Sequence, residues 1–98
     1  MKDDNAEAYY KKGQCYLQMK EWKRAVTSLT TAIYLDQGYK LKSLSERARA
    51  YLELQNLTEA RKDIDKLIAT DPGSSENFEL RGMLQTKENQ IGEAILSF

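Results

Sequence analysis

The chain repeats itself at a step of roughly 35 residues, and this periodicity constrains its fold more than any other feature. One step places Gly13 on Ala48, Tyr16 on Tyr51, Trp22 on Leu57, Ala25 on Ala60, Leu29 on Ile64 and Asp36 on Asp71. A second step places Ala48 on Gly82, Ala60 on Ala94, Leu44 on Phe78 and Ile64 on Phe98. Three copies are therefore present, and the third is cut short. Repeats of this length are the units of solenoids, in which each unit packs on its neighbours.

Within each copy, apolar residues are spaced as on one face of a helix. In the first copy, one stripe contains Ala6, Tyr9, Tyr10, Gly13, Tyr16 and Leu17, and the next contains Trp22, Ala25, Val26, Leu29, Ala32 and Ile33. Turn-forming residues separate the stripes at Lys20-Glu21, Gln55-Asn56, Asn89-Gln90, Gln37-Gly38 and Asp71-Pro72-Gly73-Ser74. The pattern predicts an all-α chain of helical hairpins. We expect helices over residues 5–19, 22–36, 41–54, 57–70, 75–88 and 91–98.

Each hairpin carries a small residue on both of its helices at a constant separation. The pairs in the first two copies are Gly13 with Ala25 and Ala48 with Ala60. Small residues that face each other let two helix backbones approach closely, while larger neighbours fill the space alongside. We therefore expect enlargement of Ala25 or Ala60 to destabilise the fold by about 1–3 kcal/mol through overpacking.

The composition argues against several classes of function. Lys plus Arg and Asp plus Glu both number 15, so no net field attracts nucleic acid. With no histidine and only Cys15, we expect neither a metal site nor a disulfide, and a reducing, cytoplasmic environment. Apolar runs are short, so we expect neither a signal peptide nor a membrane span. We expect no cofactor and no enzymatic activity.

Some residues could indicate chemistry but have simpler structural interpretations. Cys15 has no histidine to activate it, which favours a partly buried structural thiol. Asp63 and Asp65 are predicted to lie on the solvated part of a surface helix. Basic residues recur once per copy, and their long stems are predicted to cover the hydrophobic seam while the charges stay in water. These basic residues are Lys12, Arg47 and Arg81. Trp22 opens a second helix and is predicted to pack in the core.

The recurring residues resemble the tetratricopeptide repeat, and the resemblance covers residues 6–98. The residues that carry it are Tyr9, Gly13, Tyr16, Ala25, Leu29 and Ala32, then Leu44, Ala48, Tyr51, Ala60, Ile64 and Pro72, then Phe78, Gly82, Ala94 and Phe98. The main departures are Gln37 for proline, Leu67 for alanine and Gln85 for tyrosine. The resemblance implies one domain, residues 1–98, that forms a tetratricopeptide-type α-solenoid of repeats 6–39, 41–74 and 75–98, the last incomplete. It also implies a protein-binding scaffold or adaptor.

The repeat length also matches pentatricopeptide repeats, which are similar to RNA-reading modules. The recurring Gly/Ala, Ala and Pro positions and the zero net charge favour the protein-binding family.

In such a solenoid, the first helix of each hairpin lines a concave surface that can hold an extended peptide or a helix. The predicted groove residues are those that hairpin packing leaves free. They are Glu7, Tyr10, Gln14, Leu17, Gln18, Lys42, Ser45, Arg49, Leu52, Glu53, Glu76, Glu79, Met83, Thr86 and Lys87. We expect Tyr10, Arg49 and Met83 to be the main partner contacts, because aromatic, arginine and methionine side chains suit such contacts. The alternative is that Tyr10 caps the core and Arg49 is a solvated charge.

Within the tetratricopeptide family, three stretches are most similar to the co-chaperone branch, which grips acidic chaperone tails through a two-carboxylate clamp. These stretches are residues 12–14, 45–48 and 80–82. The clamp's basic and amide donors are absent, and Tyr10, Gln14, Glu46, Glu76 and Leu80 occupy their positions. Acidic residues in place of donors would repel an acidic tail. The sequence therefore predicts a neutral, basic or amphipathic ligand.

The last predicted helix presents an apolar edge that no later helix covers. Ile91, Ile95 and Phe98 form this edge. Because terminal repeats normally need a polar cap, we expect either a fragment of a longer repeat protein or a chain that self-associates through this edge. Self-association, or packing within a larger complex, is the alternative to peptide binding.

Overall fold

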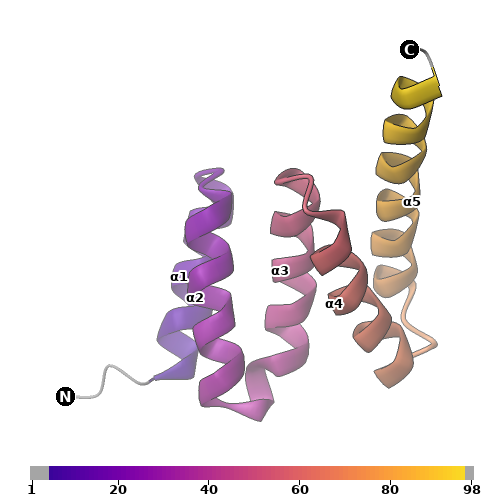
Figure 1. Ribbon diagram of the computed structural model, residues 1–98. Coiled ribbons are helices and arrows are strands. Elements are labelled where there is room, and N and C mark those ends of the chain that lie inside the picture. Colours follow the sequence, from indigo (N-terminus) through magenta and orange to yellow (C-terminus); the bar gives the residue numbers. More distant parts are fainter. Residues whose placement is uncertain (1–4, 97–98) are drawn as a thin grey trace.

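The computed structural model describes the backbone of residues 5–96 and the side chains of residues 5–92. Over this range the chain forms five α-helices and one 3₁₀ turn, without strands. They are α1 (Ala6–Gln18), α2 (Trp22–Leu35), η1 (Gln37–Tyr39), α3 (Lys40–Glu53), α4 (Leu57–Thr70) and α5 (Ser75–Leu96), shown in Figure 1. The prediction of an all-α repeat solenoid is confirmed.

The two turns inside the hairpins share one backbone geometry. Lys20 and Gln55 both adopt φ of 62°, the left-handed conformation that non-glycine residues rarely take. After α1, the Lys20 and Glu21 amides donate to the carbonyls of Leu17 and Tyr16, at 3.0 and 2.8 Å. The corresponding bonds close α3, so both helices end in a Schellman motif. The predicted breaks at Lys20-Glu21 and Gln55-Asn56 are therefore confirmed.

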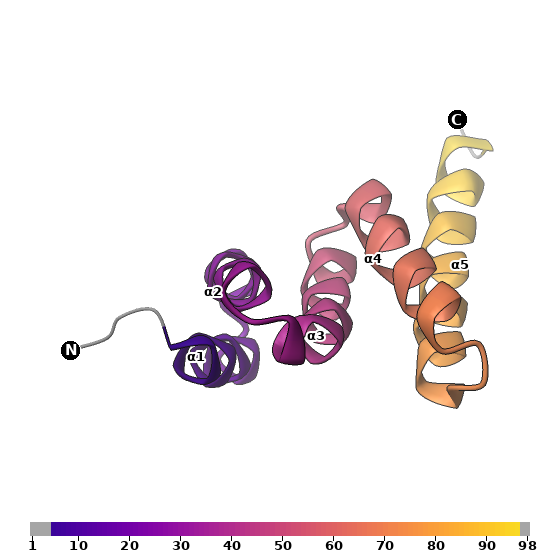
Figure 2. The ribbon, with the colours of Figure 1, turned by 90° about the horizontal axis from the view of Figure 1, so that it is seen from below.

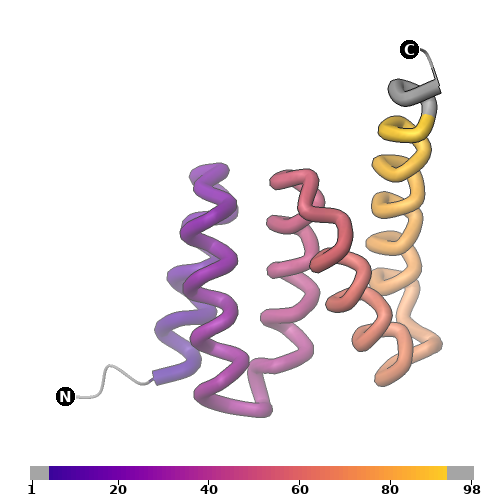
Figure 3. The backbone as a smooth tube through the Cα atoms, viewed as in Figure 1, coloured from indigo at the N-terminus to yellow at the C-terminus, as the bar shows by residue number. Residues whose placement is uncertain are grey.

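The helices form two layers along an elongated array of 55 × 30 × 18 Å. Helices α1, α3 and α5 lie in one layer, and α2 and α4 lie on one side of it (Figure 2). Each helix packs on the next along the chain, and α3 also contacts α1 and α5. The path of the backbone in Figure 3 follows this order from the first hairpin to α5.

The small residues mark the closest approaches between helices. Ala25, Ala48 and Ala60 are fully buried, as the constant separation predicted. A Cβ atom added to Gly13 would lie 2.6 Å from Leu29 Cγ, too close for any packed structure. The larger core cluster joins α3, α4 and α5 and comprises Leu44, Ala48, Leu52, Ala60, Ile64, Leu67, Leu80 and Leu84.

The third hairpin is not formed as predicted, because α5 continues as one helix through Asn89 and Gln90. Neither residue is excluded from a helix, and the residues before them are strong helix formers. One face of α5 consequently stays open along the described chain. Phe78 is 47% exposed, and a Cβ atom added to Gly82 would meet nothing within 4 Å.

Candidate partner-binding groove

A cleft of about 400 Å³ opens on the layer formed by α1, α3 and α5, and we call it the groove. Its lining residues are Gln14, Leu17, Gln18, Trp22, Glu46, Arg49, Glu53 and Met83. Apolar side chains come from α1, the start of α2 and α5, whereas α3 supplies the charges. The groove therefore combines an apolar surface with a charged one.

A hydrogen-bonded network connects the three helices at the groove. The Gln14 side-chain amide donates to the Tyr10 hydroxyl and to a Glu46 carboxylate oxygen, both at 3.2 Å. Arg49 lies 3.9 Å from Glu46 and 3.4 Å from Glu76, measured between guanidinium nitrogen and carboxylate oxygen. The network links α1, α3 and α5 and engages Arg49, the one basic residue among the described residues of the groove lining.

The electrostatic character of the groove is acidic. Its lining contains two carboxylates, Glu46 and Glu53, against Arg49, and Glu76 adds a third carboxylate beside that arginine. Burial, with the negative charges of Glu46 and Glu76, raises the pKa of the Tyr10 phenol above its ordinary value. A cationic group entering the groove would meet carboxylates that Arg49 neutralises only in part.

Comparison with known protein families identifies two stretches of the chain. Residues 6–39 and residues 43–74 each match the tetratricopeptide repeat family, and together they span more than half of the chain. The chain belongs to the tetratricopeptide repeat family. Its repeats indicate a protein–protein interaction module, and modules of this family are generally not enzymes.

The tetratricopeptide groove contains some of the predicted binding residues. Gln14, Leu17, Arg49 and Met83 line it, and so do Gln18 and Glu53. Trp22 and Glu46 were not predicted to contact a partner. Trp22 does pack against a smaller core cluster of Ala25, Leu29 and Ala50, yet this partly exposed residue also lines the groove. The sequence did contain a signal for Glu46, because this residue occupies a position that contacts the ligand in clamp-type repeats.

Leu52 does not belong to the groove, and its prediction as a groove residue is wrong. The side chain is fully buried in the larger core cluster, which also includes Leu80 and Leu84 of α5. The helical pattern of α3 alone does not show which face α5 takes. Leu80, which also occupies a clamp position, is likewise buried in the larger core cluster and does not line the groove.

The remaining predicted groove residues lie around the cleft. Lys42, Ser45 and Glu76 line a smaller hollow of about 190 Å³ beside the loop between α4 and α5. Tyr10 is half-buried, and its ring centroid lies 5.5 Å from that of Tyr39. The other members of the predicted set, Glu7, Glu79, Thr86 and Lys87, are exposed or half-buried, and Glu7 pairs with Lys11. Their part in binding stays a prediction.

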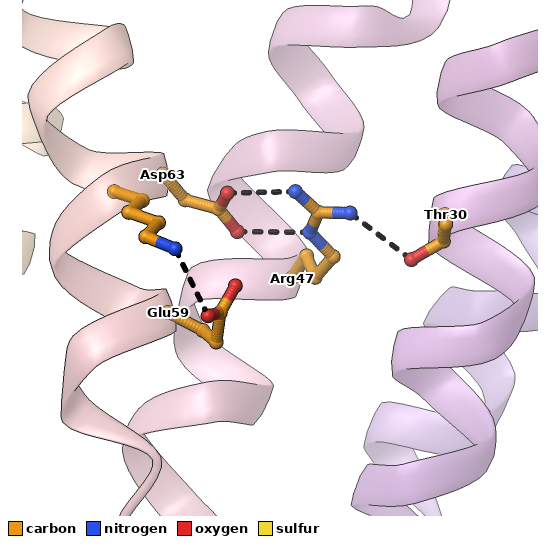
Figure 4. Close-up of polar contacts among 5 residues, drawn as sticks. Thr30, Arg47, Glu59 and Asp63 are labelled. Carbon is orange, nitrogen blue, oxygen red and sulfur yellow. Dashed lines mark hydrogen bonds and ion pairs between the residues drawn. The ribbon is translucent and has the colours of Figure 1, made fainter.

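Arg47 and Asp63 form a buried ion pair, contrary to the solvated roles predicted for them. Arg47 donates two bonds to the Asp63 carboxylate, at 2.7 and 2.9 Å, and a third to the Thr30 hydroxyl at 3.0 Å (Figure 4). The bonds to Asp63 raise the pKa of the Arg47 guanidinium, against the lowering effect of burial. Because Asp63 is only 2% exposed, the hairpin interior rather than water satisfies its charge.

Two further predictions concern accessibility. Cys15 is exposed, so the partly buried thiol predicted for it is wrong. Of the predicted C-terminal edge, Ile91 is 42% exposed, whereas the side chains of Ile95 and Phe98 lie outside the described residues.

Across residues 5–96, no helix is both long and apolar enough to cross a membrane.

Proposed function

We propose that this tetratricopeptide module is an adaptor whose groove binds an amphipathic peptide segment bearing a basic side chain. The observation that carries the proposal is the pairing of an apolar wall with a partly neutralised acidic one in the same cleft. A purely apolar ligand would leave the carboxylates of the groove without a partner, and a purely charged ligand would leave its apolar wall uncovered.

The apolar wall supports an anchoring role for a partner side chain. Leu17, Trp22 and Met83 converge on the groove from α1, α2 and α5, and each remains partly accessible. Tryptophan provides large contact area at low entropic cost, and methionine adapts to different shapes. An aliphatic or aromatic ligand residue would bury itself against these three side chains.

The acidic wall supports selection of a cation and discrimination against acidic tails. Glu53 lines the groove and forms no ion pair with any described residue. Glu46 and Glu76 share Arg49. A lysine or arginine of the ligand would pair with Glu53, whereas an acidic chaperone tail would meet repulsion. The adaptor role proposed here is therefore distinct from clamp-type co-chaperone binding, and we place it in the cytosol, consistent with the single free thiol.

The test is selection of ligands from a random peptide display library, followed by titrations that use Trp22 fluorescence, because this is the only tryptophan. Selected peptides should combine basic and apolar residues. Glu53→Lys should weaken their binding by about tenfold or more, because it reverses the unpaired charge. Asp65→Lys makes the same charge change on an exposed site of α4 and should leave binding unchanged. Equal affinity of the native chain and the Glu53→Lys variant would refute the proposal.

A second candidate function is assembly through the exposed apolar side chains of α5. Phe78 is 47% exposed on the open face that it shares with Gly82, and Ile91, on another side of the helix, is 42% exposed. Light scattering would show a concentration-dependent dimer that Phe78→Glu abolishes. A strict monomer at high micromolar concentration would exclude this function for the chain.

A further inference from the structure

Another cavity lies on the side of α3 opposite the groove, and we call it the outer pocket. It has a volume of about 280 Å³ and is lined by Ile33, Tyr34, Gln37, Lys40, Leu44, Arg47 and Lys66. On α3, the outer-pocket residues and the groove residues are separated by about half a turn around the helix axis. Helices α2 and α4, which flank it, both pack on α3 (Figures 1 and 2).

The charged residues that line the outer pocket are all basic. Lys40, Arg47 and Lys66 line it, and no carboxylate is among its lining residues. Arg47 is neutralised by Asp63, but neither lysine forms an ion pair with a carboxylate of the described chain. Two lysines from different helices, α3 and α4, therefore line one cavity, and neither pairs with a carboxylate of the described residues.

The neutral polar residues of the outer pocket can also donate hydrogen bonds. Tyr34 and Gln37, which carry a hydroxyl and a side-chain amide, also line it, and Tyr34 is 85% exposed at the surface. With the two lysines, they form a set of donors from α2, η1, α3 and α4. Ile33 and Leu44 supply the apolar part of the lining. Such a set suits a compact oxyanion rather than a cation or an apolar group.

The ion pair behind the outer pocket fixes the positions of its walls. Arg47 joins α3 to Asp63 of α4 and to Thr30 of α2, so the three helices that form the pocket are tied together at its base. The pocket is consequently formed before any ligand arrives, which removes a reorganisation cost from binding.

We propose that the outer pocket binds a phosphomonoester group, with Lys40 and Lys66 as its charge partners. The two unpaired ammonium groups match the charge of about −1.5 to −2 that such a group carries at neutral pH, whereas a single carboxylate would leave one of them uncompensated. The site is independent of the groove. It gives the module a second, charge-selective contact on the opposite face, toward a phosphorylated partner or metabolite.

The test is NMR titration of the amide signals of the full chain at constant ionic strength. The probes are inorganic phosphate, a blocked tripeptide with a central phosphoserine, and the same tripeptide with serine or glutamate. Saturable shifts should appear at Lys40, Leu44 and Lys66 with both phosphate probes. The glutamate peptide should bind about tenfold more weakly, because one ammonium group stays unpaired, and the serine peptide should not bind. Equal binding of glutamate and phosphoserine would overturn the assignment.

Matched variants distinguish binding in the outer pocket from non-specific attraction of phosphate to surface lysines. Lys40→Gln/Lys66→Gln should abolish saturable binding, whereas Lys12→Gln/Lys23→Gln, which removes the same charge from exposed positions, should retain it. Equal losses in both double variants would refute the site. Phosphoserine binding tighter than that of inorganic phosphate supports a peptide-borne ligand, and equal binding supports a small phosphate. The Glu53→Lys variant should bind phosphate as the native chain does, so this proposal and that for the groove fail separately.

Discussion

At the scale of single residues, Arg47 links three helices of the two repeats. Its guanidinium donates to Asp63 of α4 and Thr30 of α2, and its charge lies 5.6 Å from the centroid of the Tyr51 ring. A buried charge pair stabilises a fold little against an apolar replacement, but the loss of one partner leaves the other buried and unpaired. The pair therefore makes each member dependent on the other.

This dependence predicts strong coupling between the two positions. Asp63→Ala and Arg47→Leu should each lower the free energy of unfolding by about 3–5 kcal/mol. The double variant should lose much less than the sum, because it leaves no unpaired charge. Urea denaturation of the four proteins in a double-mutant cycle measures the coupling. Additive losses would show that the ion pair is not a unit.

The left-handed turn residues predict an unusual gain in stability. Lys20 and Gln55 hold a positive φ that costs side-chain-bearing residues about 1–2 kcal/mol, whereas glycine adopts it freely. Glycine also loses more entropy on folding, by about 0.5–1 kcal/mol. The net expectation for Gln55→Gly is stabilisation of up to about 1 kcal/mol in urea denaturation. Gln85→Gly, in the interior of α5, is the control and should destabilise.

At the scale of helices, the periodic small residues have different roles in the first and last copies. Gly13 lies against Leu29 of α2, so even one methyl group would be blocked by a fully buried side chain. Gly82 occupies the same place in the repeat, but α5 has no second helix against it within the described chain. The same residue type is thus required by packing at one site and not at the other.

The two glycines should respond in opposite directions to the same substitution. Gly13→Ala should destabilise by about 1–3 kcal/mol through overpacking. Gly82→Ala should stabilise by about 0.5–1 kcal/mol, because alanine is the better helix former and space is free. Thermal unfolding followed by circular dichroism measures both. Destabilisation by Gly82→Ala would indicate that another helix packs closely on this face of α5.

The sequence predicted α1 to α4 to within one residue at each end, because periodic apolar positions and turn chemistry agree there. It failed at Asn89-Gln90, where local propensity favours a continuous helix. The groove was predicted in part. Leu52 and the Arg47–Asp63 pair were misplaced because the face that each neighbouring helix covers depends on tertiary packing. Likewise, the outer pocket unites residues of several helices that no single helical stripe connects.

At the scale of the whole molecule, stability should vary along the array, because each repeat contacts only its neighbours. Among the described residues, helix α5 packs on α4 and α3, with Leu80 and Leu84 buried in the core that they share and an Arg61–Glu88 ion pair at the surface. A smaller core cluster of Ala25, Leu29 and Ala50 joins the first hairpin to α3, and it contains no residue of α5. A defect at one end should therefore remain local.

Leu80→Ala tests this organisation, because the side chain is fully buried between α5 and the second repeat. The substitution should cost about 2–5 kcal/mol through lost burial and a cavity, and hydrogen exchange should accelerate mainly in α5 and the facing parts of α3 and α4. Phe78→Ala, on the open face of the same helix, should cost less than about 1 kcal/mol. Hydrogen exchange with mass spectrometry separates the two responses. Uniform acceleration from α1 to α5 would mean that the array unfolds as one unit. In that case a partner bound in the groove, which includes Met83 of α5, would stabilise the first repeat as much as the last.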